Sequence, residues 1–386
     1  MIERGQAYMK NKLVSILLGL ALTGLCFAQS NEQRETARNA QSLPAAKVEK
    51  IESAIRAWME LNKAPALSAA IVTDNQMRWS KAFGLADVEN AVPARPDTAF
   101  RLASIAKSMT AVAVMQLVER GKIDLEAPIS KYCAAYPQKV ALKDAPDKQY
   151  SITVRQLLVH QSGVRHNKPD EVLTTRHYNN IGEAIGSFKA DPLVIEPGTK
   201  YSYSTPGYTL LGCAIEAASG MSYRDYMREN VFKPAGMTHT FIDDVYAIIP
   251  NRARGYRKTQ SGEIQNAPLH DTSIKVPGGG LLTTAEDIAK FAIALNTNRL
   301  VKAETLAQMW TKPKTSDGKE QGYAMGFLVN DENGRLRISN DGAQAGTRTY
   351  LLLLPKQKFA IALMTNLERA ACEELVPKII EALEEK

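Results

Sequence analysis

The chain has 386 residues, of which 45% are hydrophobic and 23% are charged, a balance typical of globular rather than disordered proteins. The formal net charge is +7, but Lys and Arg are scattered and form no basic tract, so no nucleic-acid partner is expected. Length alone leaves open whether the chain forms one large domain or two.

The first 28 residues have the pattern of a secretory signal peptide. Lys10 and Lys12 precede an apolar run over 13–28, which is short for a membrane span and ends at Ala28 in a sequence similar to a cleavage site. We expect cleavage after Ala28, no stable membrane span in the mature protein, and a periplasmic or extracellular location. A retained membrane anchor is the alternative.

Three cysteines would remain after that cleavage, namely Cys133, Cys213 and Cys372. An odd number does not suit a disulfide framework, and Cys213 lies in an apolar run with helical spacing, so we expect buried free thiols. The five His residues are dispersed and show no metal-binding spacing. The sequence therefore predicts neither a metal site nor another cofactor.

The N-terminal part of the mature chain predicts a lead-in, a helix and a hairpin. Residues 29–45 are polar and are expected to form a flexible lead-in. Residues 48–61 have helical apolar spacing. The strand-like runs 68–73 and 77–83 follow, joined by a loop at residues 74–76.

The middle of the chain predicts helices. Residues 105–120 are strongly apolar at helical spacing, and the pattern stops at Gly121. The segments 154–160, 208–218 and 285–295 also have helical patterns.

The C-terminal part predicts strands again. The runs 336–339, 347–354 and 359–365 are strand-like, with a turn at residues 355–358. A closing helix covers about 371–384.

Strands at both ends and helices between them predict an α+β fold. The simplest packing joins the two ends into one antiparallel sheet flanked by helices, with an inserted all-helical lobe. This places the sheet lobe at about 46–103 and 275–386 and the helical lobe at about 104–274, within one domain of residues 46–386. A cleft between the lobes is then the natural substrate site.

Ser104 and Lys107 form an S-x-x-K motif at the start of the long apolar helix. Residues at this spacing lie on one helix face, so the amine can reach the hydroxyl. A serine hydroxyl needs a base, and burial at a helix N-terminus lowers the pKa of a lysine so that it can serve as one. The same N-terminus directs backbone N–H groups at a developing oxyanion. A helix-capping serine and a solvated lysine are the alternative.

A second S-x-x-K match occurs at Ser316 and Lys319. Chance alone gives about one or two such matches in a chain of this length, so the surroundings must decide between them. The second match lies in a polar loop with nothing to bury the lysine, which favours Ser104 as the nucleophile.

Tyr203 lies in a tight loop, between Pro197-Gly198 and Pro206-Gly207, just before a predicted helix. A phenol near a lysine ammonium can lose its proton more easily and act as a base. A tyrosine that packs in a turn is the alternative.

The segment Asn340-Asp341-Gly342 lies between two predicted strands and is followed by Ala343. Small residues at the start of a strand allow a substrate backbone to approach closely. A polar turn is the alternative.

Together these segments resemble the class C β-lactamase-like serine hydrolases, a group that includes carboxylesterases and D-alanyl-D-alanine carboxypeptidases. The similarity covers roughly 64–366 and includes the segments 100–107, 157–163 and 278–284 in order and spacing. Within the group, the chain is most similar to the mitochondrial serine β-lactamase-like proteins.

The resemblance implies a role for each residue of the motifs. Ser104 would be the nucleophile, Lys107 its activator, and Tyr203 first the general base and then the acid for the leaving group. The oxyanion hole would consist of the backbone N–H groups of Ser104 and Ala343.

Three further positions, Thr205, Asn340 and Gly342, would contact the substrate by the same resemblance. Two of them depart from the family pattern, because Thr205 stands where the family has Asn and Asn340 stands where it has Lys or His. A threonine still donates a hydrogen bond. Asn340, by contrast, lacks the cation that commonly engages a substrate carboxylate.

The sequence thus predicts a serine hydrolase that cleaves ester or peptide-like amide bonds through an acyl-enzyme on Ser104. Its substrate would be a small ester, a peptide or a β-lactam-like compound. The alternatives are a D,D-peptidase or β-lactamase, and a binding protein that kept the fold and lost catalysis. A Ser-His-Asp hydrolase using His160 or His270 is disfavoured, because no G-x-S-x-G motif occurs.

Overall fold

The computed structural model describes residues 42–332 and 334–385. The predicted signal peptide and most of the predicted lead-in lie outside these residues. The chain divides into two compact units, Met1–Val48 and Glu49–Lys386, and the following description concerns the second.

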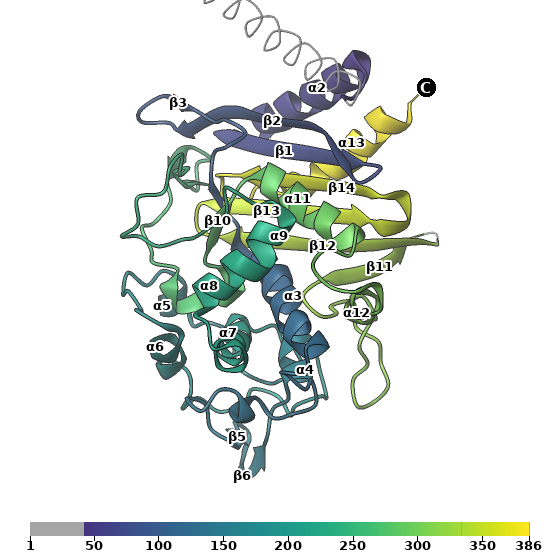
Figure 1. Ribbon diagram of the computed structural model, residues 1–386. Helices are drawn as coiled ribbons and strands as arrows, with labels where there is room; N and C mark the ends of the chain where they lie inside the picture. The colour runs from purple at the N-terminus through teal and green to yellow at the C-terminus, as the bar shows by residue number, and fades with distance from the viewer. Residues whose placement is uncertain (1–41, 333, 386) are drawn as a thin grey trace, which may run out of the picture. The chain divides into compact units, whose positions relative to one another are not determined.

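A seven-stranded sheet is the largest sheet of the described residues (Figure 1). Its order is β11-β12-β13-β14-β1-β2-β3, and all neighbouring strands are antiparallel. Because β14 pairs with β1, with Ile361 opposite Ile71, the two ends of the domain share one sheet, as the sequence predicts. The strands are β1 (Ala66–Thr73), β2 (Gln76–Asp87), β3 (Val92–Pro93), β11 (Leu328–Glu332), β12 (Arg335–Gln344), β13 (Thr347–Leu354) and β14 (Phe359–Thr365).

The predicted long helices are all present, and among the described residues no helix is long and apolar enough to cross a membrane. The helices are α2 (Ala45–Asn62), α3 (Ala106–Glu119), α4 (Val154–Leu158), α5 (Pro169–Val172), α6 (Ile181–Gly186), α7 (Thr205–Ser219), α8 (Tyr223–Met227), α9 (Lys233–Ala235), α10 (Val276–Gly279), α11 (Ala285–Asn296), α12 (Ala303–Met309) and α13 (Leu375–Glu384).

Helices cover both faces of the seven-stranded sheet. On β2, Ser80 donates a hydrogen bond to Glu286 of α11, while the next residue, Lys81, pairs with Glu52 of α2. Neighbouring side chains of a strand point to opposite faces, so α11 and α2 lie on opposite sides of the sheet. This double cover explains why β1 is buried along nearly its whole length.

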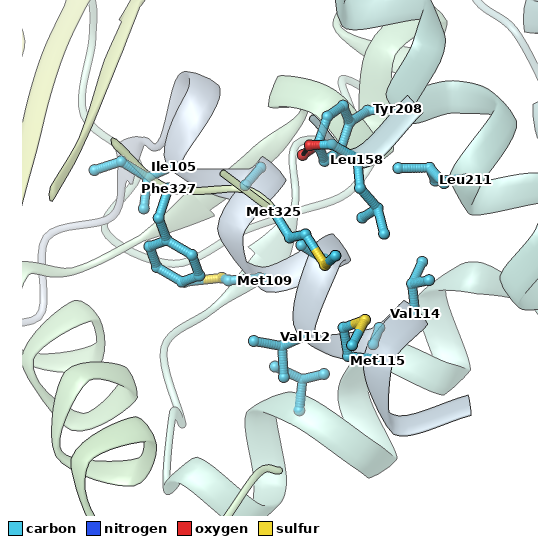
Figure 2. Packing of buried hydrophobic residues seen from close by; sticks show 14 of the residues in the cluster. Ile105, Met109, Val112, Val114, Met115, Leu158, Tyr208, Leu211, Met325 and Phe327 are labelled. Atoms are coloured by element: carbon cyan, nitrogen blue, oxygen red, sulfur yellow. Dashed lines mark hydrogen bonds between the residues drawn. The ribbon is translucent and has the colours of Figure 1, made fainter. Parts of the chain in front are cut away.

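The central lobe is built around α3, which is buried on almost every side. Its residues Met109 and Met115 pack among side chains of other segments, including Leu211 of α7 and Phe327 (Figure 2). A helix that is apolar all round is stable only inside the protein, which is why α3 forms the centre of the lobe. The residue that follows Ser104, Ile105, belongs to the same cluster, so the packing of α3 also anchors the nucleophile.

The prediction that this lobe is all-helical is wrong, because it also contains short strands. The longest of them, Ala145–Tyr150, is polar and largely exposed, so it lacks the apolar alternation that would reveal a strand in the sequence. The additional strands pair as β5 (Val140–Leu142) with β6 (Ala145–Tyr150), β8 (Tyr256–Lys258) with β9 (Ile264–Asn266), and β4 (Phe100–Arg101) with β10 (Leu281–Thr283) and β7 (Phe241–Ile242).

Cys133 and Cys213 form a disulfide, so the prediction of free thiols is wrong for these two residues. They are 80 residues apart in the sequence, and only the tertiary fold brings Cys213 of α7 next to Cys133. Cys372 is free and buried, as predicted.

Candidate functional site

Ser104 lies in a tight turn between β4 and α3. A short 3-10 helix, Ala103–Ile105, leads directly into α3. Ala103 has a φ of +53°, in the left-handed region that residues with a side chain rarely adopt. The turn is held on both sides, because Leu102 donates its N–H to Leu281 at 2.8 Å and accepts from the Thr349 hydroxyl at 2.8 Å. Its strained backbone therefore fixes Ser104 at the N-terminus of the buried helix.

The structure brings Ser104, Lys107 and Tyr203 into direct contact. The Ser104 Oγ accepts a hydrogen bond from the Lys107 Nζ at 3.2 Å and another from the Tyr203 hydroxyl at 2.7 Å. Tyr203 comes from the loop before α7, so residues distant in the sequence meet at one oxygen atom.

Lys107 is completely buried, and no carboxylate pairs with it in the part of the chain that the structure describes. Its Nζ donates to the Gly278 carbonyl at 2.6 Å and to the Thr205 Oγ1 at 3.1 Å. Burial holds the pKa of Lys107 well below its usual range; the positive charge of Lys275 lowers it further, and the Asp341 carboxylate opposes both.

The same contacts accommodate an uncharged Lys107 amine when the Ser104 hydroxyl donates its hydrogen bond to the amine instead of accepting one. A neutral amine has two N–H groups and one lone pair, and the Gly278 carbonyl and the Thr205 hydroxyl can accept the two N–H groups. The lone pair then faces the Ser104 hydroxyl, 3.2 Å away, and can take its proton. Thr205, which the resemblance places at the substrate, contacts Lys107 through its hydroxyl. The Gly278 carbonyl, a backbone atom, was not among the predicted site groups.

Burial makes the proton of the Tyr203 phenol harder to remove. Burial raises the pKa of its phenol above the ordinary value, an effect that the hydrogen bond to Ser104 only partly offsets. The Lys107 Nζ lies 4.7 Å from the centre of the Tyr203 ring, over its face. The expectation that a nearby ammonium makes this phenol easier to ionise is therefore wrong for this arrangement.

Two histidines hold the loop of Tyr203 and Thr205, a role that the sequence did not predict for either of them. The His160 Nδ1 accepts the backbone N–H of Ser204 at 3.1 Å, and the His166 Nδ1 accepts that of Thr205 at 3.2 Å. The Ser204 hydroxyl also caps α7, which starts at Thr205 and so begins earlier than its apolar pattern indicates. Histidines at these positions fix the loop by hydrogen bonds that no local spacing reveals.

Neither histidine considered for a Ser-His-Asp arrangement is hydrogen-bonded to Ser104. The His160 ring packs behind Tyr203, with ring centres 4.3 Å apart, and burial holds its pKa well below the usual value. His270 contacts the Arg101 guanidinium at 2.9 Å. This geometry does not support the Ser-His-Asp alternative.

The Asn340 side chain, which the resemblance places at the substrate, is hydrogen-bonded within the protein. It is only 3% exposed, and its Nδ2 donates to the Ser108 hydroxyl at 2.9 Å and to the Gly326 carbonyl at 3.0 Å. Its Oδ1 accepts the backbone N–H of Asp341 at 2.9 Å. The amide is thus occupied by the protein, and Asn340 ties β12 to α3.

The segment Asn340-Asp341-Gly342 lies within the strand β12, whereas the sequence predicted that it lies between two strands. β12 continues through Gln344 by pairing with β13, whereas its pairing with β11 ends at Ser339. One edge of this half of β12 is therefore unpaired. The backbone N–H of Asp341 donates to the Asn340 side chain and not to β13. Backbone N–H groups two residues apart in a strand point to the same edge, so the N–H of Ala343 also points to the unpaired edge of β12.

Gly342 brings this edge against the turn of Ser104. A Cβ on Gly342 would lie 2.4 Å from the Leu102 carbonyl oxygen and 2.2 Å from the Thr349 hydroxyl, so only a glycine fits without a shift. At Gly342 the missing side chain makes room for the protein's own turn. This contact holds the strand that carries Ala343 against the turn that carries Ser104.

Arg348 is engaged by two carboxylates next to the site. Its guanidinium lies 3.0 Å from Asp341 and 2.5 Å from Glu373. The group therefore presents no free cation, and the Asp341 charge acts on both Lys107 and Tyr203.

The second S-x-x-K match forms no such site. The Lys319 side chain is 82% exposed and pairs with Asp317 at 2.7 Å, which raises its pKa. Ser316 lies in the same loop, so the surroundings expected from the sequence are confirmed.

Among residues 42–332 and 334–385, no group of His, Cys, Asp and Glu is arranged to hold a metal ion. The absence of a cofactor stays a prediction.

Comparison with known proteins identifies the family. Residues 51–381 match the family described as Beta-lactamase. The mitochondrial serine beta-lactamase-like protein LACTB of Homo sapiens is 31% identical, over 76% of this chain and 69% of that protein. Protein flp of Staphylococcus aureus is 27% identical, over 87% of this chain and 65% of that protein.

A solved structure agrees with this result. The octameric penicillin-binding protein homologue from Pyrococcus abyssi superimposes with a TM-score of 0.72 and 27% identity, over 87% of this chain and 77% of that one. The chain therefore belongs to the beta-lactamase family, a superfamily of serine hydrolases, and has its antiparallel-sheet and helix fold.

Proposed function

We propose that this protein hydrolyses ester or peptide-like amide bonds through an acyl-enzyme on Ser104. The observation that carries the proposal is the Lys107 amine, which is buried without a carboxylate partner and lies 3.2 Å from the Ser104 Oγ. A lysine in that state is a base, and a serine beside it is a nucleophile.

In acylation, Lys107 takes the Ser104 proton while the Oγ attacks the substrate carbonyl carbon. The negative charge that develops on the carbonyl oxygen is stabilised by the N–H groups of Ser104 and Ala343. The bond to the leaving group then breaks, and Tyr203 donates its proton to the departing oxygen or nitrogen. The proton held on Lys107 restores the phenol, so the net result is transfer of the serine proton to the leaving group.

Deacylation uses the same groups in reverse. Water loses a proton to the Lys107 and Tyr203 pair and attacks the acyl carbon, and Ser104 departs with a proton restored to its Oγ. Thr205 supports both steps, because its Oγ1 accepts from the Lys107 Nζ at 3.1 Å and so keeps the amine aimed at Ser104.

Neutral substrates suit this site best. The Asn340 amide is occupied inside the protein, and Arg348 is paired with Asp341 and Glu373. A substrate carboxylate would therefore lack the charged partner that an ion needs when it leaves water. Short neutral esters need no such partner.

A D,D-peptidase or β-lactamase is the second candidate, supported by the family and by the penicillin-binding protein homologue. A panel of aryl esters, a chromogenic cephalosporin and D-alanyl-D-alanine peptides separates the two. Efficient turnover of the cephalosporin or the peptide together with weak esterase activity would favour the second candidate.

Labelling with a fluorophosphonate probe tests the acyl-enzyme itself. Intact-mass spectrometry should show one adduct on the wild type and none on Ser104→Ala. Ser316→Ala is the matched control and should label normally. Labelling that persists in Ser104→Ala would contradict the assignment, and a wild type that neither labels nor turns over any substrate would indicate a binding protein on this fold.

We further propose that the mature protein is exported and begins at Gln29. The apolar run that ends at Ala28 supports this, and the Cys133–Cys213 disulfide suits an oxidising compartment. Edman sequencing of material from the periplasm or medium should begin at Gln29. Recovery only from the membrane, with residues 1–28 intact, would favour a retained anchor.

A further inference from the structure

Lys275 is a second buried lysine near the site. Its side chain is nine-tenths buried, with 7% of the residue exposed, and within the described ranges 42–332 and 334–385 its amine has neither a hydrogen bond nor an ion pair. A buried cation without a partner destabilises the folded protein, so the presence of a lysine at this position calls for a physical reason.

The segment that carries Lys275 is locked against α3. Lys275 ends a 3-10 turn, Ser273–Lys275, which runs directly into α10. The Gly278 carbonyl of α10 accepts from the Lys107 Nζ at 2.6 Å, and the Pro277 carbonyl accepts from the Thr110 hydroxyl at 2.7 Å. The two lysines are thus fixed near each other by the backbone.

The neighbouring charges on this side do not neutralise Lys275. Asp243 is fully buried and is shared by Arg101 at 2.8 Å and Arg252 at 3.3 Å, so two guanidinium groups already use the one carboxylate that acts on Lys275. His270 adds no charge near neutral pH, because burial lowers its pKa to about 4.

The charges on the other sides of Lys107 are few. On β12, Asp341 is engaged by Arg348. In the loop before α5, burial lowers the pKa of His166 to about 4 and holds that of His160 well below its usual value, so both rings are uncharged. The positive charge of Lys275 is therefore not balanced from these directions.

We propose that Lys275 is a positioning residue that keeps the Lys107 amine in its uncharged, proton-accepting form. The inference rests on the proposed function, in which Lys107 acts as a base. The charge of Lys275 lowers the pKa of Lys107 in addition to burial. Burial lowers the pKa of Lys275 itself to about 8, so Lys275 is mostly positively charged below that pH.

The test is the pH dependence of kcat/KM for a neutral aryl ester in the wild type and in Lys275→Met. Loss of the neighbouring charge raises the pKa of Lys107, so the acid limb should move to higher pH by about one unit. Lys275→Arg keeps the charge and should keep the limb near its wild-type position. A purely structural role would lower kcat/KM at every pH and leave the limb in place.

Lys290→Met is the matched control, because Lys290 is paired with Asp287 on α11 at 2.8 Å. Its acid limb should not move. If Lys275→Met does not fold, Lys275→Gln makes the same change of charge. An unchanged limb in the neutral variant, or an equal shift in Lys275→Arg, would overturn the inference.

A direct titration separates this inference from the proposed function. Carbon-13 NMR of the lysine Cε signals, assigned with Lys107→Arg, reports the pKa of Lys107 without turnover. That pKa should rise in Lys275→Met. A rise without esterase activity would keep the electrostatic coupling and refute the hydrolase, whereas an unchanged pKa in an active enzyme would refute only the coupling.

Discussion

Gly342 packs against Ala103 so closely that a Cβ at position 342 would lie 3.1 Å from the Ala103 Cβ. Ala103 precedes the nucleophile and has a strained backbone with a φ of +53°. At Gly342, the free edge of β12 and the Ser104 turn, which are distant parts of the chain, therefore pack directly against each other. Any shift of one relative to the other changes the distance between Ser104 and the Ala343 N–H.

Gly342→Ala should impair activity more than stability. The added methyl group overlaps the Leu102 carbonyl oxygen, and overpacking of this kind typically costs about 1–3 kcal/mol of unfolding free energy. Because the displaced atoms hold together the turn and the strand that carry the proposed oxyanion-hole N–H groups, kcat for an aryl ester should fall by about a hundredfold. Steady-state kinetics and thermal unfolding measure the two effects.

Gly186→Ala is the control for this substitution. Gly186 ends α6, and a Cβ there has no neighbouring atom within 4 Å. Activity and melting temperature should stay at the wild-type level. Normal kcat in Gly342→Ala would mean that Ala343 does not contribute to the oxyanion hole.

Tyr203→Phe should lower kcat for a poor leaving group by about a hundredfold and leave KM nearly unchanged, because a proton donor acts mainly in the transition state. The loss should be smaller for a good leaving group such as p-nitrophenolate, which needs little protonation. Comparison of aryl and alkyl esters measures this. Equal losses for both would indicate that Tyr203 serves only to orient Ser104.

The helices and strands that the sequence predicts well are those whose burial leaves a simple pattern of apolar residues. β13 and β14 are central strands buried on both faces, so they read as continuous apolar runs and their predicted bounds are confirmed. α3 was equally clear from its apolar composition. The Ser104 and Lys107 pair could be recognised because both partners lie on one turn of one helix.

The remaining site features depend on contacts between distant segments. The Gly278 carbonyl is a backbone atom and leaves no pattern in the sequence. Asn340 looked like a ligand-binding residue because its chemistry is polar, but strand alternation directs it toward α3, and its register could not be derived without knowing where β11 stops. The pairing of Cys133 with Cys213 likewise required the packing of α7.

Asn340→Leu should destabilise the protein without changing its choice of substrate. The substitution leaves the Ser108 hydroxyl and the Gly326 carbonyl without their buried donor, and unsatisfied groups of this kind cost about 1–3 kcal/mol each. Urea unfolding should therefore show a lower midpoint. The ratio of kcat/KM for an aryl butyrate to that for a cephalosporin should stay the same.

Asn266→Leu is a suitable control, because Asn266 is exposed and donates only to Glu89 at 2.6 Å. Its unfolding free energy should stay within about 0.5 kcal/mol of the wild type. A large change of substrate preference in Asn340→Leu would mean that the amide turns toward the cleft when substrate binds.

The final prediction concerns substrates that carry a carboxylate. Aryl butyrates should be cleaved with a much higher kcat/KM than penicillins, because Arg348 is held by Asp341 and Glu373 and is not free to receive an anion. A neutral donor is worth about 1 kcal/mol in such a contact and a charged donor roughly twice that. Asp341→Asn removes one of the two carboxylates and should raise kcat/KM for a penicillin by about tenfold, which corresponds to about 1.4 kcal/mol.

Two further variants, together with Asp341→Asn, test whether Arg348 stays paired with its carboxylates or binds the substrate carboxylate. Asp147→Asn makes the same charge change on the exposed β6 strand and should leave both substrates unaffected. Because Asp341 also raises the pKa of Lys107, the comparison is made on the pH plateau of each variant. Arg348→Ala should not lower penicillin turnover if the guanidinium is fully engaged by its partners. If Arg348→Ala abolishes cephalosporin or penicillin hydrolysis while ester hydrolysis continues, the arginine leaves its two carboxylates to bind the substrate, and the preference for neutral substrates has another cause.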